Sequence, residues 1–268
     1  MTPSVHPGGN PFVWYELMTS DVAAAQEFYA KVAGWTTSEI DANGAPYTIL
    51  SANGEAIGGM FGLPDEATAG GSSPGWFGYI AVPDADAALA AMVADGATAH
   101  MPVTHIEQVG KIAMLADPHG ATFYIIQPEG EGPVTAFSPM PSPGKIGWNE
   151  LLAADAGQAL AFYGRHAGWE EKGAMDMGPM GSYHFFGLPD GATLGALMSR
   201  TADMPPPKWK HYIWVDEIDA AHERLKAAGG QVRMGPQEVP GPLFVIEAVD
   251  PQGASFALVG ERHGSGAE

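Results

Sequence analysis

The chain of 268 residues contains no cysteine. This absence excludes disulfide bonds, thiolate nucleophiles and cysteine-ligated metal sites. Basic residues are scarce as well: 12 Lys and Arg stand against 31 Asp and Glu, so the formal net charge at pH 7 is −19. A surface this negative repels phosphate backbones and anionic lipid head groups. We therefore expect no nucleic-acid partner and no membrane partner.

Targeting signals and several catalytic motifs are also missing from the sequence. No basic and then apolar segment follows Met1, and no apolar run approaches the roughly 18 residues of a membrane-spanning helix. We therefore expect a cytoplasmic protein. The glycine-rich nucleotide-binding motifs, the nucleophile elbow G-x-S-x-G and the zinc motif H-E-x-x-H are absent too.

The composition that is present, 46% hydrophobic and 16% charged residues, is typical of a folded globular protein. The charge is unevenly spread along the chain. Residues 1–134 carry 15 acidic side chains and only two basic ones, and the first arginine of the chain is Arg165. A pocket built only from the first half therefore lacks a guanidinium group with which to bind a carboxylate or a phosphate.

The sequence repeats itself internally. The segment FYAKVAGW at 28–35 returns as FYGRHAGW at 162–169, and DPHGATF at 117–123 returns as DPQGASF at 250–256. These matches indicate a tandem duplication of a unit of roughly 130 residues. A stretch rich in Pro and Gly separates the two copies and predicts a linker. The predicted boundaries are an N-terminal domain at 1–130, a linker at 131–145 and a C-terminal domain at 146–268.

Each copy divides again into two modules of one strand, one helix and about three further strands. In the first module, Asp21 is typical of a helix start and Gly34 of a helix end. This order predicts an α+β fold in which each helix covers one face of a small sheet and the other face borders a cavity. The four modules are expected at about 10–66, 75–130, 146–200 and 208–262.

The βαβββ modules, the helix motif F-Y-x-K/R-x-A-G-W, the segment HYIWVDEIDAA and the D-P-x-G turn resemble the vicinal oxygen chelate superfamily. That superfamily includes glyoxalase I, extradiol dioxygenases and bleomycin-resistance proteins. More narrowly, the chain resembles two-domain bacterial glyoxalase-like proteins. The resemblance implies two tandem domains, each with a curved mixed sheet around a cavity. It also implies a divalent metal that chelates two neighbouring oxygens of a substrate.

The resemblance places metal ligands on the first and last strands of paired modules. Only one of these positions holds a ligand-type side chain, and a stable site needs at least three protein donors. We therefore expect no cofactor, and a divalent metal, if bound, would use His211 and Glu150. The positions that correspond to the ligands are Trp14, Gly78, Trp148, Tyr124, His211 and Ala257.

Two glutamates accompany the tryptophans at these positions. Because side chains alternate along a strand, Glu16 shares a face with Trp14, and Glu150 shares a face with Trp148. A carboxylate on an inward face must be paired or partly protonated, and such a group can act as a general base. Alternatively, both glutamates bond backbone groups or tyrosine hydroxyls and hold the duplicated strands together. The sequence leaves both interpretations open.

The second half also carries histidines that the first half lacks. His184 and His211 correspond to Thr48 and Gly78, so Glu150, His184 and His211 are predicted to form an acid/base cluster in the second cavity. A histidine on a strand can instead be a buried polar group of the core. The residues expected to bind substrate are Trp148, Tyr183, Trp14, Glu16 and Tyr124.

These observations favour an enzyme that acts on a small neutral oxygenated or aromatic molecule by proton transfer, as in isomerase, lyase or hydratase reactions. Glu150 would be the base, with His211 and His184 as acid or orienting groups. One alternative is a sequestering protein of the bleomycin-resistance type. Another is a metal-dependent lyase or dioxygenase with non-standard ligands. In each case the partner is a small-molecule ligand, and the chain is expected as a monomer or a homodimer.

Overall fold

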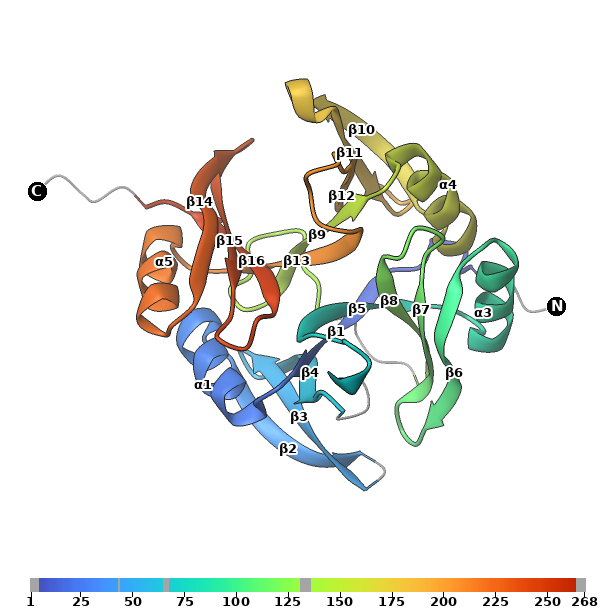
Figure 1. The fold of residues 1–268 in the computed structure, drawn as a ribbon, viewed down its shortest axis with the longest axis horizontal. Coiled ribbons are helices and arrows are strands. Elements are labelled where there is room, and N and C mark those ends of the chain that lie inside the picture. The colour runs from blue at the N-terminus through green and yellow to red at the C-terminus, as the bar shows by residue number, and fades with distance from the viewer. Residues whose placement is uncertain (1–4, 43, 65–67, 131–135, 264–268) are drawn as a thin grey trace, which may run out of the picture. The chain divides into compact units, whose positions relative to one another are not determined.

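The computed structural model describes residues 5–42, 44–64, 68–130 and 136–263. Each half of the chain contains two helices of ten or twelve residues and eight strands among the described residues (Figure 1). The elements of the first half are β1 (Phe12–Thr19), α1 (Val22–Ala33), β2 (Thr36–Ala42), β3 (Ala45–Ala52), β4 (Glu55–Gly62), β5 (Gly75–Ala81), α3 (Ala85–Ala94), β6 (Thr98–Ile106), β7 (Gly110–Ala116) and β8 (Thr122–Pro128). Those of the second half are β9 (Ile146–Ala153), α4 (Ala156–Ala167), β10 (Glu170–Asp176), a short 3-10 helix (Gly178–Met180), β11 (Ser182–Gly187), β12 (Thr193–Ser199), β13 (Lys208–Trp214), α5 (Ile218–Ala227), β14 (Gln231–Val239), β15 (Leu243–Val249) and β16 (Ser255–Glu261).

The duplicated helices α1 and α4 begin and end as their sequence signals predict. The Asp21 carboxylate accepts a hydrogen bond from the backbone N–H of Ala24, and Asp155 accepts one from Gln158. Such caps satisfy N–H groups that the first helical turn leaves without partners. At the other end, Gly34 and Gly168 have φ of 72° and 67°, a left-handed conformation that favours glycine.

Two eight-stranded sheets follow the duplication. Their strand orders are β2-β3-β4-β1-β5-β8-β7-β6 and β10-β11-β12-β9-β13-β16-β15-β14. Both sheets are mixed: the strand pairs β1–β4 and β12–β9 are parallel, whereas β3–β4 and β11–β12 are antiparallel. The predicted α+β class and the tandem repetition are therefore confirmed. None of the helices in the described part of the chain has the length and apolar composition that crossing a membrane requires.

The packing groups the modules into two compact units. Unit 1 consists of residues 1–14, 77–134 and 148–210, and unit 2 of residues 15–76, 135–147 and 211–268. Within unit 1, α3 packs against α4; within unit 2, α1 packs against α5 (Figure 1). Each unit therefore contains one module from each half of the chain. Residues 131–135 of the predicted linker lie outside the described residues.

The two repeated sequence motifs meet inside unit 2 as a buried hydrogen-bonded network. The Tyr29 hydroxyl of the helix motif donates to Oδ2 of Asp250 in the D-P-x-G turn over 3.0 Å, and it accepts a bond of 2.8 Å from Nε1 of Trp76. Burial, followed by the nearby Asp250 charge, raises the pKa of Tyr29 well above its ordinary value. The phenol therefore keeps its proton and acts as a donor.

Unit 1 contains the same network. Tyr163 donates to Oδ2 of Asp117 over 3.2 Å and accepts a bond of 3.1 Å from Nε1 of Trp209. Burial, with the Asp117 charge as the next cause, also raises the pKa of Tyr163 well above its ordinary value. The helix motif of one half thus bonds the turn motif of the other half in each unit.

Candidate active site

A chain of polar contacts connects three strands of the second half within unit 1. Nε1 of Trp148 on β9 donates to the Tyr183 hydroxyl on β11 over 3.0 Å. That hydroxyl in turn donates to Oε2 of Glu150 over 2.8 Å. Nζ of Lys210 on β13 donates to the other carboxylate oxygen, Oε1, over 3.2 Å. Glu150 therefore lies between a phenol and an ammonium group.

Strand order and register explain how these residues meet. Trp148 and Glu150 lie on one face of β9 because side chains alternate along a strand. β12 and β13 flank β9, and Glu150 pairs with Ala196 on β12, which pairs with Phe185 on β11. Tyr183 of β11 reaches Glu150 across β12. Lys210 approaches from the strand on the other side of β9.

The ion pair of this cluster is shielded from water. The side chains of Glu150 and Lys210 are each 15% exposed. Opposite charges interact more strongly in such surroundings than at an exposed surface, since there is less water to screen them. Both side chains keep some contact with solvent.

The first half repeats the Tyr–Glu contact. Glu16 is buried and accepts a 2.9 Å hydrogen bond from the Tyr47 hydroxyl. The Tyr47 ring lies directly over Gly59, where a Cβ atom would stand only 2.0 Å from the hydroxyl oxygen. In the duplicated sequence, the position of Lys210 is held by Phe77. Both glutamates thus bond a tyrosine hydroxyl, as one of the two interpretations of the sequence expects, and Glu150 also pairs with the Lys210 ammonium.

Aromatic residues distinguish the first half further. The rings of Tyr79 on β5 and Tyr124 on β8 are stacked, with centroids 4.3 Å apart and planes 3° from parallel. Both are buried, whereas Trp14, two residues before Glu16 on β1, is partly exposed. The strand pair that corresponds to β5 and β8 in the second half brings together Tyr212 and Ala257. The second phenol of the stack is therefore missing there.

His184 lies on the opposite face of the sheet from Glu150. It pairs with Leu197 on β12, which pairs with Leu151 on β9, so it belongs to the row next to that of Glu150. Its Nδ1 lies 2.7 Å from Oε1 of Glu171 on β10. The structure therefore does not bring His184 into the expected cluster with Glu150, because His184 and Tyr183 alternate on one strand.

His211 also lies away from the face of Glu150. It alternates with Lys210 on β13 and shares the face of Trp209, whose indole bonds Tyr163 of helix α4. Its side chain is 2% exposed, and its ring packs edge-on against Tyr15 with centroids 4.9 Å apart. Burial lowers the pKa of His211 from 6.5 to about 3, so the ring is neutral at ordinary pH.

On β13, Lys210 contacts Glu150. His211, which the sequence favoured, alternates with Lys210 on the strand, and its predicted catalytic role stays a prediction. The matching tryptophans Trp76 and Trp209 indicate which face of each strand packs under a helix. Both belong to strands next to a helix in the same repeat. Because side chains alternate along a strand, an indole that packs under a helix places the next residue, Phe77 or Lys210, on the opposite face.

The pKa of His211 predicts a specific acid sensitivity. In the unfolded chain, His211 has an ordinary pKa near 6.5, so it binds a proton below that pH. In the folded chain, His211 stays neutral until the pH approaches about 3. The contribution of neutral His211 to the stability of the folded state is therefore complete above pH 6.5 and is lost as the pH falls below it. We expect the free energy of unfolding of the native protein to fall more steeply between pH 6.5 and 4 than that of His211→Gln, by up to about 1.4 kcal/mol per pH unit. Urea unfolding across this range measures the difference, and parallel curves would contradict it.

The residues present do not fit the divalent metal that the fold family implies. In the part of the chain that the structure describes, no three His, Asp or Glu side chains lie close enough together to hold a metal ion. The Glu150 carboxylate already has a cation beside it, the Lys210 ammonium. His211, the ligand expected from the sequence, lies on the other face of β13 and is fully desolvated. We therefore derive no step through a metal.

Comparison with known proteins agrees with this architecture. The sequence profile of the Glyoxalase/Bleomycin resistance protein/Dioxygenase superfamily matches residues 12–125 and 145–258. The chain is 32% identical to "Putative glyoxylase CFP32" of Mycobacterium tuberculosis over 248 residues, which cover 92% of this chain and 93% of that protein. It is 29% identical to the anthracycline biosynthesis protein DauV of Streptomyces sp. over 262 residues, 92% of this chain and 91% of that protein.

A solved structure shares the fold at lower sequence identity. The Mn(II)-bound glyoxalase from Novosphingobium aromaticivorans matches with a TM-score of 0.63 and 17% identity, over 96% of this chain and 83% of that one. The family profile covers both halves of the chain, and the two sheets repeat the same strand order. The chain therefore belongs to the Glyoxalase/Bleomycin resistance protein/Dioxygenase superfamily, as two tandem domains of the vicinal oxygen chelate fold.

Proposed function

We propose that the C-terminal half catalyses proton transfer on a small, neutral, oxygenated or aromatic molecule, with Glu150 as the base. The observation that carries this proposal is the Glu150 carboxylate held between the Tyr183 hydroxyl and the Lys210 ammonium. A general base needs a fixed position within hydrogen-bond reach of the substrate proton. The hydrogen bonds from Tyr183 and Lys210 orient the Glu150 carboxylate, whose side chain is partly accessible.

The proposed reaction begins at a carbon next to a carbonyl group. Glu150 accepts the proton from this carbon, and the electron pair moves onto the carbonyl oxygen. An ammonium carries three N–H donors, so Lys210 can bond Glu150 and the developing oxyanion together. In an α-hydroxycarbonyl compound, the oxyanion gains a proton, the adjacent hydroxyl loses one, and Glu150 returns its proton to the former carbonyl carbon, which gives isomerisation. In a β-hydroxycarbonyl compound, the β-hydroxyl takes the proton from Glu150 and leaves as water, which gives a lyase reaction.

Trp148 and Tyr183 have positioning roles in this scheme. The indole N–H of Trp148 donates to the Tyr183 oxygen, so the phenol directs its own proton toward Glu150. The hydrogen bond from Tyr183 to Oε2 leaves Oε1, the other oxygen of the Glu150 carboxylate, directed toward Lys210. The Trp148 ring, together with Phe185 at a centroid distance of 6.1 Å, provides an aromatic surface for the substrate. His184 and His211 have no part in the reaction on this geometry.

The names of the relatives support the substrate class. DauV is named an anthracycline biosynthesis protein, and anthracyclines are oxygenated aromatic ring compounds with carbonyl groups. The CFP32 relative is named a glyoxylase, which also points to oxygen-rich carbonyl chemistry. We infer an enolisable carbonyl compound with an aromatic part as the substrate of this chain.

Hydrogen exchange in heavy water tests this proposal without knowledge of the natural product. The protein is incubated in D2O with a panel of aryl ketones, aryl aldehydes and hydroxyketones, and loss of the α-proton signal is followed by ¹H NMR. At least one panel member is expected to exchange faster than in the heat-denatured control. Absence of catalysed exchange throughout the panel would contradict the proposal.

Sequestration of an aromatic molecule is the second candidate function, and a feature of the first half favours it. Phe77, which holds the position of Lys210, is partly exposed and lies edge-on to Tyr124 at a centroid distance of 6.2 Å, beside the buried stack of Tyr79 and Tyr124. Aromatic ligands stack on such surfaces. Saturable quenching of tryptophan fluorescence by the panel compounds, without exchange of their α-protons, would favour this function over catalysis.

A further inference from the structure

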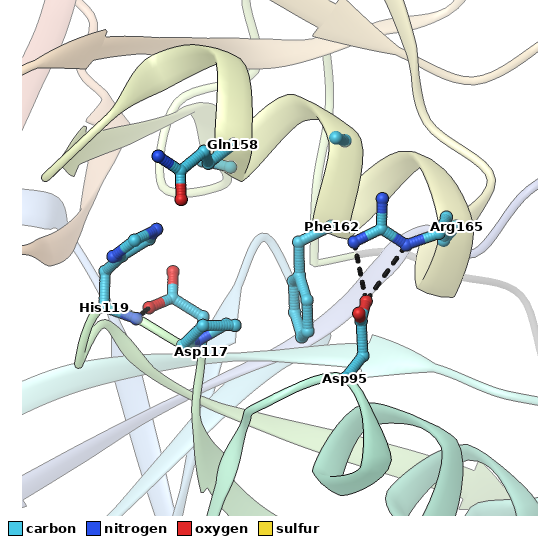
Figure 2. A pocket seen from close by; sticks show the side chains of 9 residues that line it. Asp95, Asp117, His119, Gln158, Phe162 and Arg165 are labelled. Atoms are coloured by element: carbon cyan, nitrogen blue, oxygen red, sulfur yellow. Dashed lines mark hydrogen bonds and ion pairs between the residues drawn. The ribbon is translucent and has the colours of Figure 1, made fainter.

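A polar pocket lies in unit 1, between helix α4 and the turn that follows β7. Its volume is about 320 Å3, which is within the range of small-molecule sites. One wall is a stripe of α4, the other is the D-P-H-G turn at 117–120 together with the end of α3 (Figure 2). Trp148, Glu150, Tyr183 and Lys210 are not among the residues that line it. The pocket is therefore separate from the candidate active site.

The pocket has two polar ends and an apolar middle. His119 and Gln158 lie at one end beside the Asp117 carboxyl group, and Arg165 and Asp95 lie at the other end, with the Phe162 ring between them (Figure 2). The Arg165 guanidinium donates twice to Oδ2 of Asp95, over 3.0 and 2.7 Å. This ion pair closes one end of the pocket and leaves the charge of Asp117 as the dominant charge of the other end.

Comparison of the two units shows which residues of the pocket also occur at the equivalent junction of helix and turn in unit 2. The buried Tyr–Asp bond is present in both units, as Tyr163–Asp117 and as Tyr29–Asp250. The side chains around it differ. In unit 2, Gln158, His119, Arg165 and Asp95 of the pocket are replaced by Ala24, Gln252, Lys31 and Ala228. The polar lining of the unit 1 pocket is therefore not needed to build the junction of helix and turn.

We propose that this pocket binds a small organic amine with an apolar body. The ionised side chains that line it, Asp95, Asp117 and Arg165, carry a net charge of −1, which favours a cation. An ammonium group has three donors, and the acceptor end offers three acceptors: the Asp117 carboxylate, the Gln158 amide oxygen and the His119 ring. The Asp117 oxygen that receives Tyr163 has a second lone pair and can accept another bond.

The apolar part of the ligand has its own place in the pocket. Phe162 is buried beneath the groove, and Pro118, Ala159 and Ala161 line it with apolar atoms. A chain or ring of about ten heavy atoms covers this surface and gains from the removal of apolar area from water. The distance between the acceptor end and the Arg165–Asp95 pair then limits the length of the ligand that fits.

Calorimetric titration with three matched probes tests the proposal: phenethylamine, the neutral 2-phenylethanol and the anionic 3-phenylpropionate. Phenethylamine is expected to bind at least tenfold more tightly than the other two. Gln158→Ala and His119→Gln are each expected to weaken phenethylamine binding severalfold, and Ala161→Trp to abolish it by filling the groove. All three positions are partly or fully exposed, and circular dichroism melting confirms that the variants fold.

The internal repeat also provides the controls for this titration. Gln252→Ala changes the matching turn in unit 2 and should leave phenethylamine affinity unchanged. Glu150→Gln should leave it unchanged as well, which separates this pocket from the candidate active site. Equal affinity for the three probes, no saturable binding of the amine at millimolar concentration, or unchanged affinity in Ala161→Trp would each overturn the proposal.

Discussion

Replacement of Asp250 by alanine is expected to lower the free energy of unfolding by about 3–5 kcal/mol. Asp250 is buried, and its Oδ1 accepts the backbone N–H groups of Gln252 and Ala254 at 3.0 and 2.8 Å. Its Oδ2 accepts the Tyr29 hydroxyl. The alanine variant leaves all three donors without their acceptor, and each buried donor left unpaired costs about 1–3 kcal/mol. Urea unfolding at pH 7, followed by fluorescence and circular dichroism, measures the loss.

Two variants separate the network from the turn itself. Asp190 also accepts a turn N–H, that of Ala192, but it is exposed, so Asp190→Ala should cost less than about 1 kcal/mol because water replaces the lost acceptor. Tyr29→Phe removes one hydroxyl but keeps the ring that stacks on Trp35 at 5.3 Å, and an intermediate loss is expected. If Asp250→Ala cost no more than Asp190→Ala, the network would not contribute to stability.

This network gives the repeated motifs a physical meaning. The tyrosine of the F-Y helix motif and the aspartate of the D-P-x-G turn are 221 residues apart in one unit and 46 apart in the other. Burial raises the pKa of Asp250 and raises that of Tyr29 well above its ordinary value, so the shared proton stays on the phenol. The repeated residues therefore build the junction between modules, and the chemistry of the protein depends on residues that differ between the copies.

The fold follows from the sequence because its signals are local and repeated. Asp21 and Gly34 mark one helix, Asp155 and Gly168 mark its copy, and the structure has helices between these residues. The partnership of modules in each compact unit depends on contacts such as Tyr29–Asp250, which join distant segments. No local pattern reports such a contact.

The candidate site could be predicted only in part. Trp148, Glu150 and Tyr183 do lie together, since alternation on β9 fixes the first two on one face. The sequence did not indicate the Lys210 contact, because it favoured the neighbouring His211 and a shift of one residue on a strand reverses the face. The catalytic roles predicted for His211 and His184 stay predictions. The spacing of the family's ligand positions did not determine which face of β13 borders the cluster, whereas the pairing of Trp209 with Tyr163 does.

The largest effect on activity is expected from Glu150→Gln. The amide keeps the size of the side chain and an oxygen for the Tyr183 hydroxyl, but it cannot accept a proton from carbon. Removal of a general base commonly lowers turnover by about 100- to 10,000-fold. We expect a loss of this size in the rate of α-proton exchange in D2O, with little change in the unfolding midpoint. Glu16→Gln is the matched control in the first half, since Glu16 has the same tyrosine contact and Phe77 holds the position of Lys210 there, and it should retain the exchange rate.

Lys210→Met distinguishes a catalytic pair from a structural one. The methionine fills the space of the lysine stem but leaves the partly buried Glu150 carboxylate without its counter-charge and the oxyanion without its donor. The exchange rate should therefore fall by about 100-fold or more. Because both residues act on the same proton transfer, Glu150→Gln and Lys210→Met together should be no slower than Glu150→Gln alone. Independent, multiplicative losses would mean that Lys210 acts on a different step, and an unchanged rate in Lys210→Met would remove the ammonium from the mechanism.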